Sequence, residues 1–249
     1  MSDKVIIVTG ASRGIGAATA RLAGERGYAV CVNYRRSQAA AEGVVADIER
    51  GGGRAIPVAA DVAVEADVVR LFETVDARLG RLTALVNNAG IVEPQMRVER
   101  MDAARLARMF ATNVTGGFLC AREAVRRMST RYGGAGGAIV NVSSAAARFG
   151  SPGEYVDYAA SKGAIETMTI GLAAEVVAEG IRVNAVRPGL IHTDIHAAGG
   201  EPGRIDRLKG SIPMRRGGEP IEVARAILWL LSDEASYSTG TFIDVSGGR

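Results

Sequence analysis

The strongest constraint on the fold of this 249-residue chain is a regular alternation of short, β-branched runs with longer amphipathic segments. Strand-like runs occupy residues 5–8, 28–32, 55–59, 82–86, 138–142, 181–186 and 242–245. Helical spacing of apolar residues marks 14–26, 38–50, 65–79, 102–128 (one long helix or two short ones), 158–179 and 220–231. Strands joined through helices run parallel. The sequence therefore predicts an α/β fold, a doubly wound parallel sheet (a Rossmann fold) of about seven strands with helices on both faces. No linker divides residues 1–249, so we expect a single domain.

Composition excludes several other classes of protein. The net charge is only +3 and arginines adjoin only in pairs, which argues against a nucleic-acid partner. No run approaches the roughly 18 apolar residues of a membrane span, and the chain starts without a secretion signal, so we expect a cytoplasmic protein. Cys31 and Cys120 lie far apart in apolar runs and are typical of buried thiols. His192 and His196 have no third ligand nearby, so no metal site is expected.

A glycine-rich turn follows the first expected strand and opens the first expected helix. Its glycines are spaced Gly-x-x-x-Gly-x-Gly, unlike the common Gly-x-Gly-x-x-Gly pattern. Without a Cβ, the backbone N–H groups can approach a pyrophosphate, and the helix N-terminus favours its negative charge. The turn therefore predicts a dinucleotide site with contacts from Gly10, Ser12, Arg13, Gly14, Ile15 and Gly16.

The residues after the second expected strand indicate which dinucleotide binds. NAD-binding chains usually place a carboxylate there for the ribose hydroxyl, whereas this chain has Asn33, Tyr34 and Arg35. Arg35, with Arg13, could hold a 2′-phosphate through charge-assisted hydrogen bonds. The sequence therefore favours NADP(H) over NAD(H). The alternative interpretation is that Arg13 and Arg35 are solvated surface residues without a ligand. Asp61, followed by Val62, could accept from the adenine amino group or cap the next helix.

Tyr158 and Lys162 are one helical turn apart and suit proton exchange with an alcohol or carbonyl oxygen. An ammonium near the phenol would move its pKa toward neutrality. Ser143 follows the strand at 138–142 and could donate to the substrate oxygen, with Ser144 a capping residue. Asn113 could kink the helical region around it, hold a water that relays protons to Lys162, or be simply a buried structural amide.

Taken in order, these motifs resemble the single-domain short-chain dehydrogenase/reductase family over essentially the whole chain. Further motifs that carry the resemblance are Asn87-Asn88-Ala89-Gly90, Pro188-Gly189, Thr193, Ser238-Thr239-Gly240 and Asp244-Val245-Ser246-Gly247-Gly248. The last segment departs slightly, since the family often has Val-Asp-Gly-Gly there.

The resemblance implies an oxidoreductase in which Tyr158 is the general acid and base, Lys162 binds the nicotinamide ribose and Ser143 orients the substrate. It implies that Asn113 completes a proton relay. It also implies cofactor contacts from Asn88, Ala89, Gly90, Pro188, Gly189, Ile191 and Thr193, and a homotetramer paired through the last helix and strand, where Trp229, Leu230 and Leu231 are candidate interface residues or core.

The expected substrate is a small carbonyl compound or secondary alcohol. A sugar-like substrate is favoured by polar residues that flank the expected pocket, namely Arg148, Glu154, Tyr155, His192 and His196. A 3-oxoacyl-[acyl-carrier-protein] reductase is the alternative, with Arg126, Arg127 and Arg131 as a patch for an acidic carrier. Ala174 disfavours it, because such reductases tend to carry arginine there. An NADP-binding sensor without turnover is the alternative from another class. Residues 189–213 form the longest irregular region and are a candidate lid.

Overall fold

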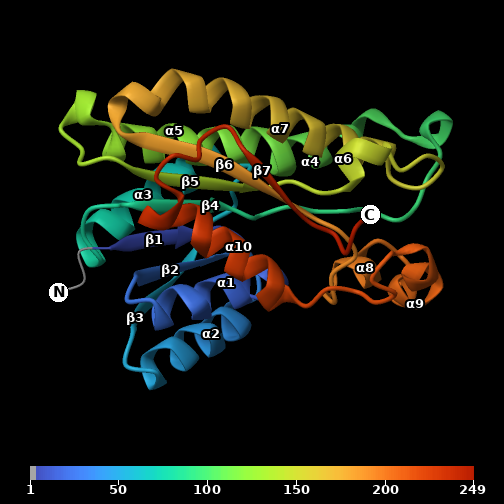
Figure 1. Cartoon of the computed structure of the whole chain (residues 1–249), viewed down its shortest axis with the longest axis horizontal. Coiled ribbons are helices and arrows are strands. Elements are labelled where there is room, and N and C mark those ends of the chain that lie inside the picture. The colour runs from blue at the N-terminus through green and yellow to red at the C-terminus, as the bar shows by residue number, and fades with distance from the viewer. Residues whose placement is uncertain (1–3) are drawn as a thin grey trace.

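Seven parallel strands form one sheet in the order β3-β2-β1-β4-β5-β6-β7 (Figure 1). The computed structural model describes residues 4–249. Residues 1–3 lie outside the described part, although the expected domain and the expectation about a secretion signal include them. The strands are β1 (Val5–Val8), β2 (Ala29–Tyr34), β3 (Arg54–Ala59), β4 (Ala84–Asn87), β5 (Gly137–Val142), β6 (Ile181–Pro188) and β7 (Phe242–Val245). The predicted doubly wound parallel sheet is confirmed.

Helices cover both faces of the sheet, as the crossover rule requires. One face carries α1 (Gly14–Glu25), α2 (Gln38–Arg50) and α10 (Pro220–Leu231), and the other carries α3 (Glu65–Arg78), α5 (Gly116–Met128) and α7 (Val156–Val176). Shorter helices are α4 (Ala103–Phe110), α6 (Ala146–Phe149), α8 (Ile195–Ala198) and α9 (Arg204–Leu208). Within the described residues, no helix is long and apolar enough to span a bilayer.

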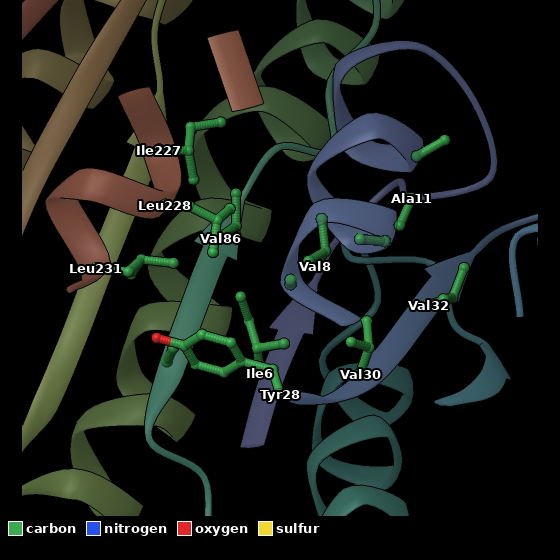
Figure 2. Close-up of a cluster of buried hydrophobic side chains, with 14 of the residues drawn as sticks. Ile6, Val8, Ala11, Tyr28, Val30, Val32, Val86, Ile227, Leu228 and Leu231 are labelled. Atoms are coloured by element: carbon green, nitrogen blue, oxygen red, sulfur yellow. The ribbon is translucent and has the colours of Figure 1, made fainter. Parts of the chain in front are cut away.

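The core follows from the two-residue period of a strand buried on both faces. In β1, Ile6 and Val8 belong to the cluster under α1, α2 and α10, while Val5 and Ile7 belong to the cluster under α3, α5 and α7. Figure 2 shows Ile227 and Leu228 of α10 projecting toward the central strands. Each fully buried side chain of this size contributes about 1.5–3 kcal/mol. Hydrophobic burial on both faces therefore fixes the sheet on which the site stands.

Two regions differ in detail from the sequence prediction. The helical region 102–128 is α4 and α5 joined by a π turn, Ala111–Thr115, which contains Asn113. Residues 189–213 are not an irregular loop, because they include the short helices α8 and α9. These helices lie at the carboxyl ends of the strands, whereas the turn after α5 lies at the opposite end of the molecule (Figure 1).

Candidate active site

The glycine-rich turn between β1 and α1 is held against the end of β4 by side-chain hydrogen bonds. Asn88 Nδ2 donates to the carbonyls of Thr9 and Gly10, at 2.8 and 3.1 Å. Thr9 Oγ1 in turn accepts from the backbone N–H groups of Asn88 and Ala89. A Cβ on Gly16 would lie 2.5 Å from both Asn88 Nδ2 and the Gly10 carbonyl oxygen. Only glycine fits at position 16, and the turn presents a preorganised backbone at the N-terminus of α1.

Asn33 supports this turn through hydrogen bonds of its side chain. Its side chain is buried, accepts from Gly10 N, and donates to the carbonyls of Val58 and Ala60. These bonds use both ends of the amide. The side chain therefore ties β2 and β3 to the turn, while Asn33 also lines the cleft and its cofactor contact stays a prediction.

Three arginines, Arg13, Arg35 and Arg36, line one end of the cleft, where Tyr34 and Asp61 also lie. Arg35 Nη1 lies 3.7 Å from Asp61 Oδ2, and both side chains are partly exposed. Such a loose surface pair is worth at most about 1 kcal/mol, so Arg35 is easily released to a stronger anion. Asp61 Oδ1 also accepts from Ala63 N, so this carboxylate shapes the turn before α3 as well as facing the cleft.

The cleft at the carboxyl ends of the strands has a volume of about 480 Å³. Every residue predicted to contact a cofactor lines it: Gly10, Ser12, Arg13, Gly14, Ile15, Gly16, Asn33, Tyr34, Arg35, Asp61, Val62, Asn88, Ala89, Gly90, Tyr158, Lys162, Pro188, Gly189, Ile191 and Thr193. Sequence reasoning did not assign further lining residues, among them Arg36, Ile91, Val92, Ser144, Ile195 and Ala198. The structure thus brings together segments from the carboxyl ends of six strands, β1 to β6.

Tyr158 and Lys162 lie on the first turns of α7 and face the cleft together. Lys162 Nζ is 5.6 Å from the centre of the Tyr158 ring and donates to the Val142 carbonyl at 2.8 Å. Burial lowers the pKa of Lys162 to about 8. Burial also raises the pKa of Tyr158, and its hydrogen bond with the Ser144 side chain opposes that rise. The expected lowering of the phenol pKa by the ammonium is not what this structure shows, and the phenol is held protonated, as a general acid requires.

The two serines after β5 both line the cleft, but their side chains have different partners, and the role predicted for Ser143 stays a prediction. Ser143 Oγ is buried and donates to Glu166 Oε1 at 2.9 Å. Arg187 pairs with the same Glu166 carboxylate at 2.7 Å, so Ser143 belongs to a structural network between β5, β6 and α7. Ser144, expected only to cap, does accept from Ala146 N, but its side chain also hydrogen-bonds Tyr158. The hydroxyl beside the reacting phenol is therefore that of Ser144.

Asn113 is buried in the π turn between α4 and α5 and is hydrogen-bonded on both sides of its amide. Oδ1 accepts from Ile91 N at 2.8 Å, and Nδ2 donates to the Ile91 carbonyl and to Ser161 Oγ. A π turn widens the helix and commonly marks a functional site. Asn113 does not line the main cleft, and its amide fixes the segment after Gly90 against α7.

Most of the polar residues expected to flank a sugar-like substrate are engaged elsewhere. Arg148 pairs with Asp244, Tyr155 Oη donates to the Gly199 carbonyl, and Glu154 pairs with Arg204. Of the five residues Arg148, Glu154, Tyr155, His192 and His196, only His196 lines the cleft. His196 Nε2 lies 2.9 Å from the Ile191 carbonyl, and burial lowers the pKa of its imidazole. The sequence argument for a hydroxylated or charged substrate therefore loses its basis.

The residues present fit a nicotinamide dinucleotide. The glycine cradle admits no Cβ at Gly16, the N-terminus of α1 favours a pyrophosphate, and cationic side chains gather at one end of the cleft. The phenol of Tyr158 and the ammonium of Lys162 lie at the other end, where hydride transfer would need a proton donor.

Comparison with known proteins gives matches over nearly the whole chain. A family model described as enoyl-(acyl carrier protein) reductase matches residues 10–249. The chain is 59% identical over 245 residues to "Uncharacterized oxidoreductase YgfF" of Escherichia coli (strain K12), covering 98% of this chain and 99% of that protein. It is 38% identical to "Glucose 1-dehydrogenase 2" of Bacillus subtilis (strain 168), covering 100% and 95%. A crystal structure of 3-ketoacyl-(acyl-carrier-protein) reductase from Brucella melitensis complexed with NADH has a TM-score of 0.92 and 32% identity, covering 100% of this chain and 98% of that one.

Proposed function

Because the chain belongs to the short-chain dehydrogenase/reductase family, whose members are oxidoreductases that bind a nicotinamide cofactor, we propose an NADP(H)-dependent reaction between a small carbonyl compound and the corresponding secondary alcohol. The observation that carries this proposal is one continuous cleft, with the arginine-rich end beside the glycine turn and the Tyr158–Lys162 pair at the other. The family as such is established by the full-length matches. The cofactor preference, the substrate and the residue roles are the proposal.

Each side chain at the catalytic end has a role that its contacts support. The bound nicotinamide supplies the hydride. Tyr158, whose phenol burial keeps protonated, donates a proton to the substrate oxygen during reduction and withdraws it during oxidation. Ser144 positions that oxygen through the same hydrogen-bond system. Lys162 provides a positive charge within 5.6 Å of the phenol ring and donates to the Val142 carbonyl. Asn113 acts through backbone and Ser161 bonds and is a positioning residue.

NADP(H) is preferred over NAD(H) on the charge of the adenosine end. Arg13, Arg35 and Arg36 line that end, and no carboxylate follows β2 to repel a 2′-phosphate. Asp61 is the nearby acid, and it already lies 3.7 Å from Arg35. Guanidinium groups bind phosphate through charge-assisted hydrogen bonds, which supports the phosphorylated cofactor.

The carrier-protein alternative loses the patch on which it depended. Arg126 and Arg127 pair with Glu123 on α5, and Arg127 also with Asp76, while Arg131 lies near Glu179. They belong to the end of α5 and the turn after it. This turn lies at the opposite end of the strands from α8 and α9 (Figure 1). An acidic carrier docked there would lie at the end of the strands away from the cleft, which disfavours delivery of a thioester to Tyr158. The sensor alternative predicts cofactor binding without turnover, and the complete catalytic end disfavours it.

We also propose the homotetramer that the resemblance implies, and a cytoplasmic location. Trp229 of α10 is partly exposed, whereas Leu230 and Leu231 beside it are core residues, so only the tryptophan is free for an interface. Cys31 and Cys120 are free buried thiols, which suits a reducing compartment.

The proposal is tested by following NADPH and NADH oxidation with small ketones, and NADP reduction with alcohols, for the wild type and Tyr158→Phe. We expect NADPH-linked turnover that falls about 10²–10⁴-fold in the variant. Tyr132→Phe, which alters an exposed tyrosine on the turn after α5, is the matched control and should leave turnover unchanged. Turnover that survives in Tyr158→Phe would refute the catalytic assignment. Tight NADPH binding with no turnover of any carbonyl would favour the sensor.

A further inference from the structure

The catalytic end of the cleft is lined in part by apolar side chains, and these limit which substrates can bind there. We propose that this substrate end accepts a small, uncharged ketone or secondary alcohol with alkyl or alicyclic substituents. The inference rests on the proposed function and adds the substrate class. We define the substrate end by the cleft residues Ser144, Tyr158, Ile91, Val92, Ile195, His196 and Ala198.

Two contacts place the apolar members of this group around the reacting phenol. A Cβ on Gly90 would lie 3.5 Å from Lys162 Nζ, so the segment that continues into Ile91 and Val92 passes the catalytic pair. A Cβ on Gly199, at the end of α8, would lie 3.4 Å from Val92 Cγ1. The segment after β4 and the helix α8 therefore close on each other, and Ile195 and Ala198 of α8 form the opposite wall.

The cation beside the substrate end is Lys162, and its ammonium already has a backbone partner. Burial lowers the pKa of His196, so its imidazole is neutral at pH 7. The arginines of the cleft lie at the adenosine end, and the Lys162 ammonium donates to the Val142 carbonyl. Asp194 also lines the cleft, but it shares a shallow surface depression with Arg13 and Arg21 on the outer side of α1. A carboxylate or phosphate bound next to Tyr158 would lose its hydration and would have to compete with the Val142 carbonyl for the Lys162 ammonium, which is unfavourable.

The substrate end also offers few hydrogen bonds to a polyol. Tyr155 Oη and Glu154, which follow the turn before α7, are used by the Gly199 carbonyl and by Arg204. The remaining polar side chains are Ser144, Tyr158 and the free ring nitrogen of His196, and the first two serve the reacting oxygen. Hydroxyl groups elsewhere on the substrate would face Ile91, Val92 and Ile195 with no partner, which disfavours a hydroxylated chain.

A network of polar contacts surrounds α9, next to the substrate end. Gln95 donates to Glu201 at 2.7 Å, and Glu201 also pairs with Arg204 at 2.9 Å. Arg204 packs over the Tyr155 ring, 4.9 Å from its centre, and pairs with Glu154. These contacts join α9 to the segments on either side of the substrate end. The network holds these segments together beside the substrate end, which favours a small ketone over a long thioester.

The experiment compares matched pairs of ketones, with kcat/KM measured under saturating NADPH. The pairs are cyclohexanone with 4-oxocyclohexanecarboxylate, and 2-pentanone with 1,3-dihydroxyacetone. We expect the apolar member of each pair to be preferred about tenfold or more, since sites discriminate strongly against groups that they leave unpaired. Ile195→Lys supplies a cation at the wall and should reduce the difference in kcat/KM between cyclohexanone and 4-oxocyclohexanecarboxylate. Val177→Lys places the same charge on an exposed residue at the far end of α7 and should leave this difference unchanged.

The outcomes separate the substrate class from the proposed function. Equal or better turnover of the carboxylate or of dihydroxyacetone, lost in Tyr158→Phe, would overturn the substrate class and leave the proposed function standing. Absence of Tyr158-dependent turnover with both members of both pairs would overturn the proposed function and the inference with it. An Ile195→Lys variant that does not reduce the difference in kcat/KM would show that Ile195 does not form the wall.

Discussion

Gly16→Ala tests whether the glycine-rich turn is a rigid cradle held by Asn88. The added Cβ would lie 2.5 Å from Asn88 Nδ2 and 2.5 Å from the Gly10 carbonyl oxygen, well inside van der Waals contact. Overpacking against backbone costs about 1–3 kcal/mol. Displacing Asn88 weakens two hydrogen bonds, at about 1 kcal/mol each. Alanine in the helix α1 recovers about 1 kcal/mol of propensity. The net loss is therefore about 2–4 kcal/mol in the free energy of unfolding.

The matched control is Gly43→Ala, the same change in an exposed position of α2 where a Cβ would meet nothing within 4 Å. It should gain about 0.5–1 kcal/mol. In a chain of this length, 1 kcal/mol shifts Tm by about 2–4 °C. Thermal melts should thus show Gly16→Ala roughly 4–16 °C below the wild type and Gly43→Ala slightly above it. Added NADPH should raise Tm of the wild type and Gly43→Ala, and raise that of Gly16→Ala much less. A Gly16→Ala protein that melts with the wild type and is equally stabilised by NADPH would refute the cradle.

Three further changes test separate parts of the cleft. Ser144→Ala should lower kcat about 10–10³-fold, because it removes the hydrogen bond to the Tyr158 phenol. Ser143→Ala should lower kcat far less, because the Ser143 hydroxyl bonds Glu166. The reverse order of the two kcat values in steady-state assays would support the role first predicted for Ser143. Arg35→Ser should weaken NADPH binding about tenfold and leave NADH binding nearly unchanged, as measured by fluorescence titration, and an equal loss for both cofactors would contradict a 2′-phosphate contact. Burial lowers the pKa of Lys162 from 10.5 to about 8, so between these values the unfolded chain binds more protons and Lys162 makes stability rise with pH. The difference in unfolding free energy between wild type and Lys162→Met should therefore rise from pH 8 to 10.5, and a flat difference in urea titrations would show that the pKa is not depressed.

The fold was predictable because two strong signals agree along the chain. Apolar runs of strand length alternate with helical periods, and both sheet faces are buried, so each strand had a clear hydrophobic signature. The structure nevertheless begins β4 at Ala84 rather than at residue 82. Thr83 precedes it, and its hydroxyl exchanges hydrogen bonds with the Val5 backbone. A tertiary contact of this kind sets the boundary, and local periodicity does not contain it.

Residues whose role depends on side-chain direction were less predictable. Ser143 and Ser144 are adjacent and chemically identical, yet one meets Glu166 on α7 and the other meets Tyr158. Two-residue alternation along β5 contains part of the signal: Asn141 bonds Thr169 of α7, and Ser143, two residues on, points to the same helix. The residue that leaves the strand is then free to turn toward the cleft. Helices α8 and α9 are shorter than any periodicity can detect, and ion pairs with distant segments such as Glu154 hold α9 in place.

The distribution of charge along the single cleft explains why one site can bind a polyanion tightly and still select a neutral reactant. At the adenosine end, guanidinium groups and the N-terminus of α1 face outward and can meet phosphate at little desolvation cost. At the catalytic end, the charged group is Lys162, and burial with one carbonyl partner already depresses its pKa to about 8. An anion bound there would have to compete with the Val142 carbonyl for that ammonium, and the walls of Ile91, Val92 and Ile195 offer it no further partner. Cofactor affinity and substrate choice therefore depend on opposite ends of the same cleft, so substitutions at Arg35 should change KM for NADPH without altering the ranking of ketones.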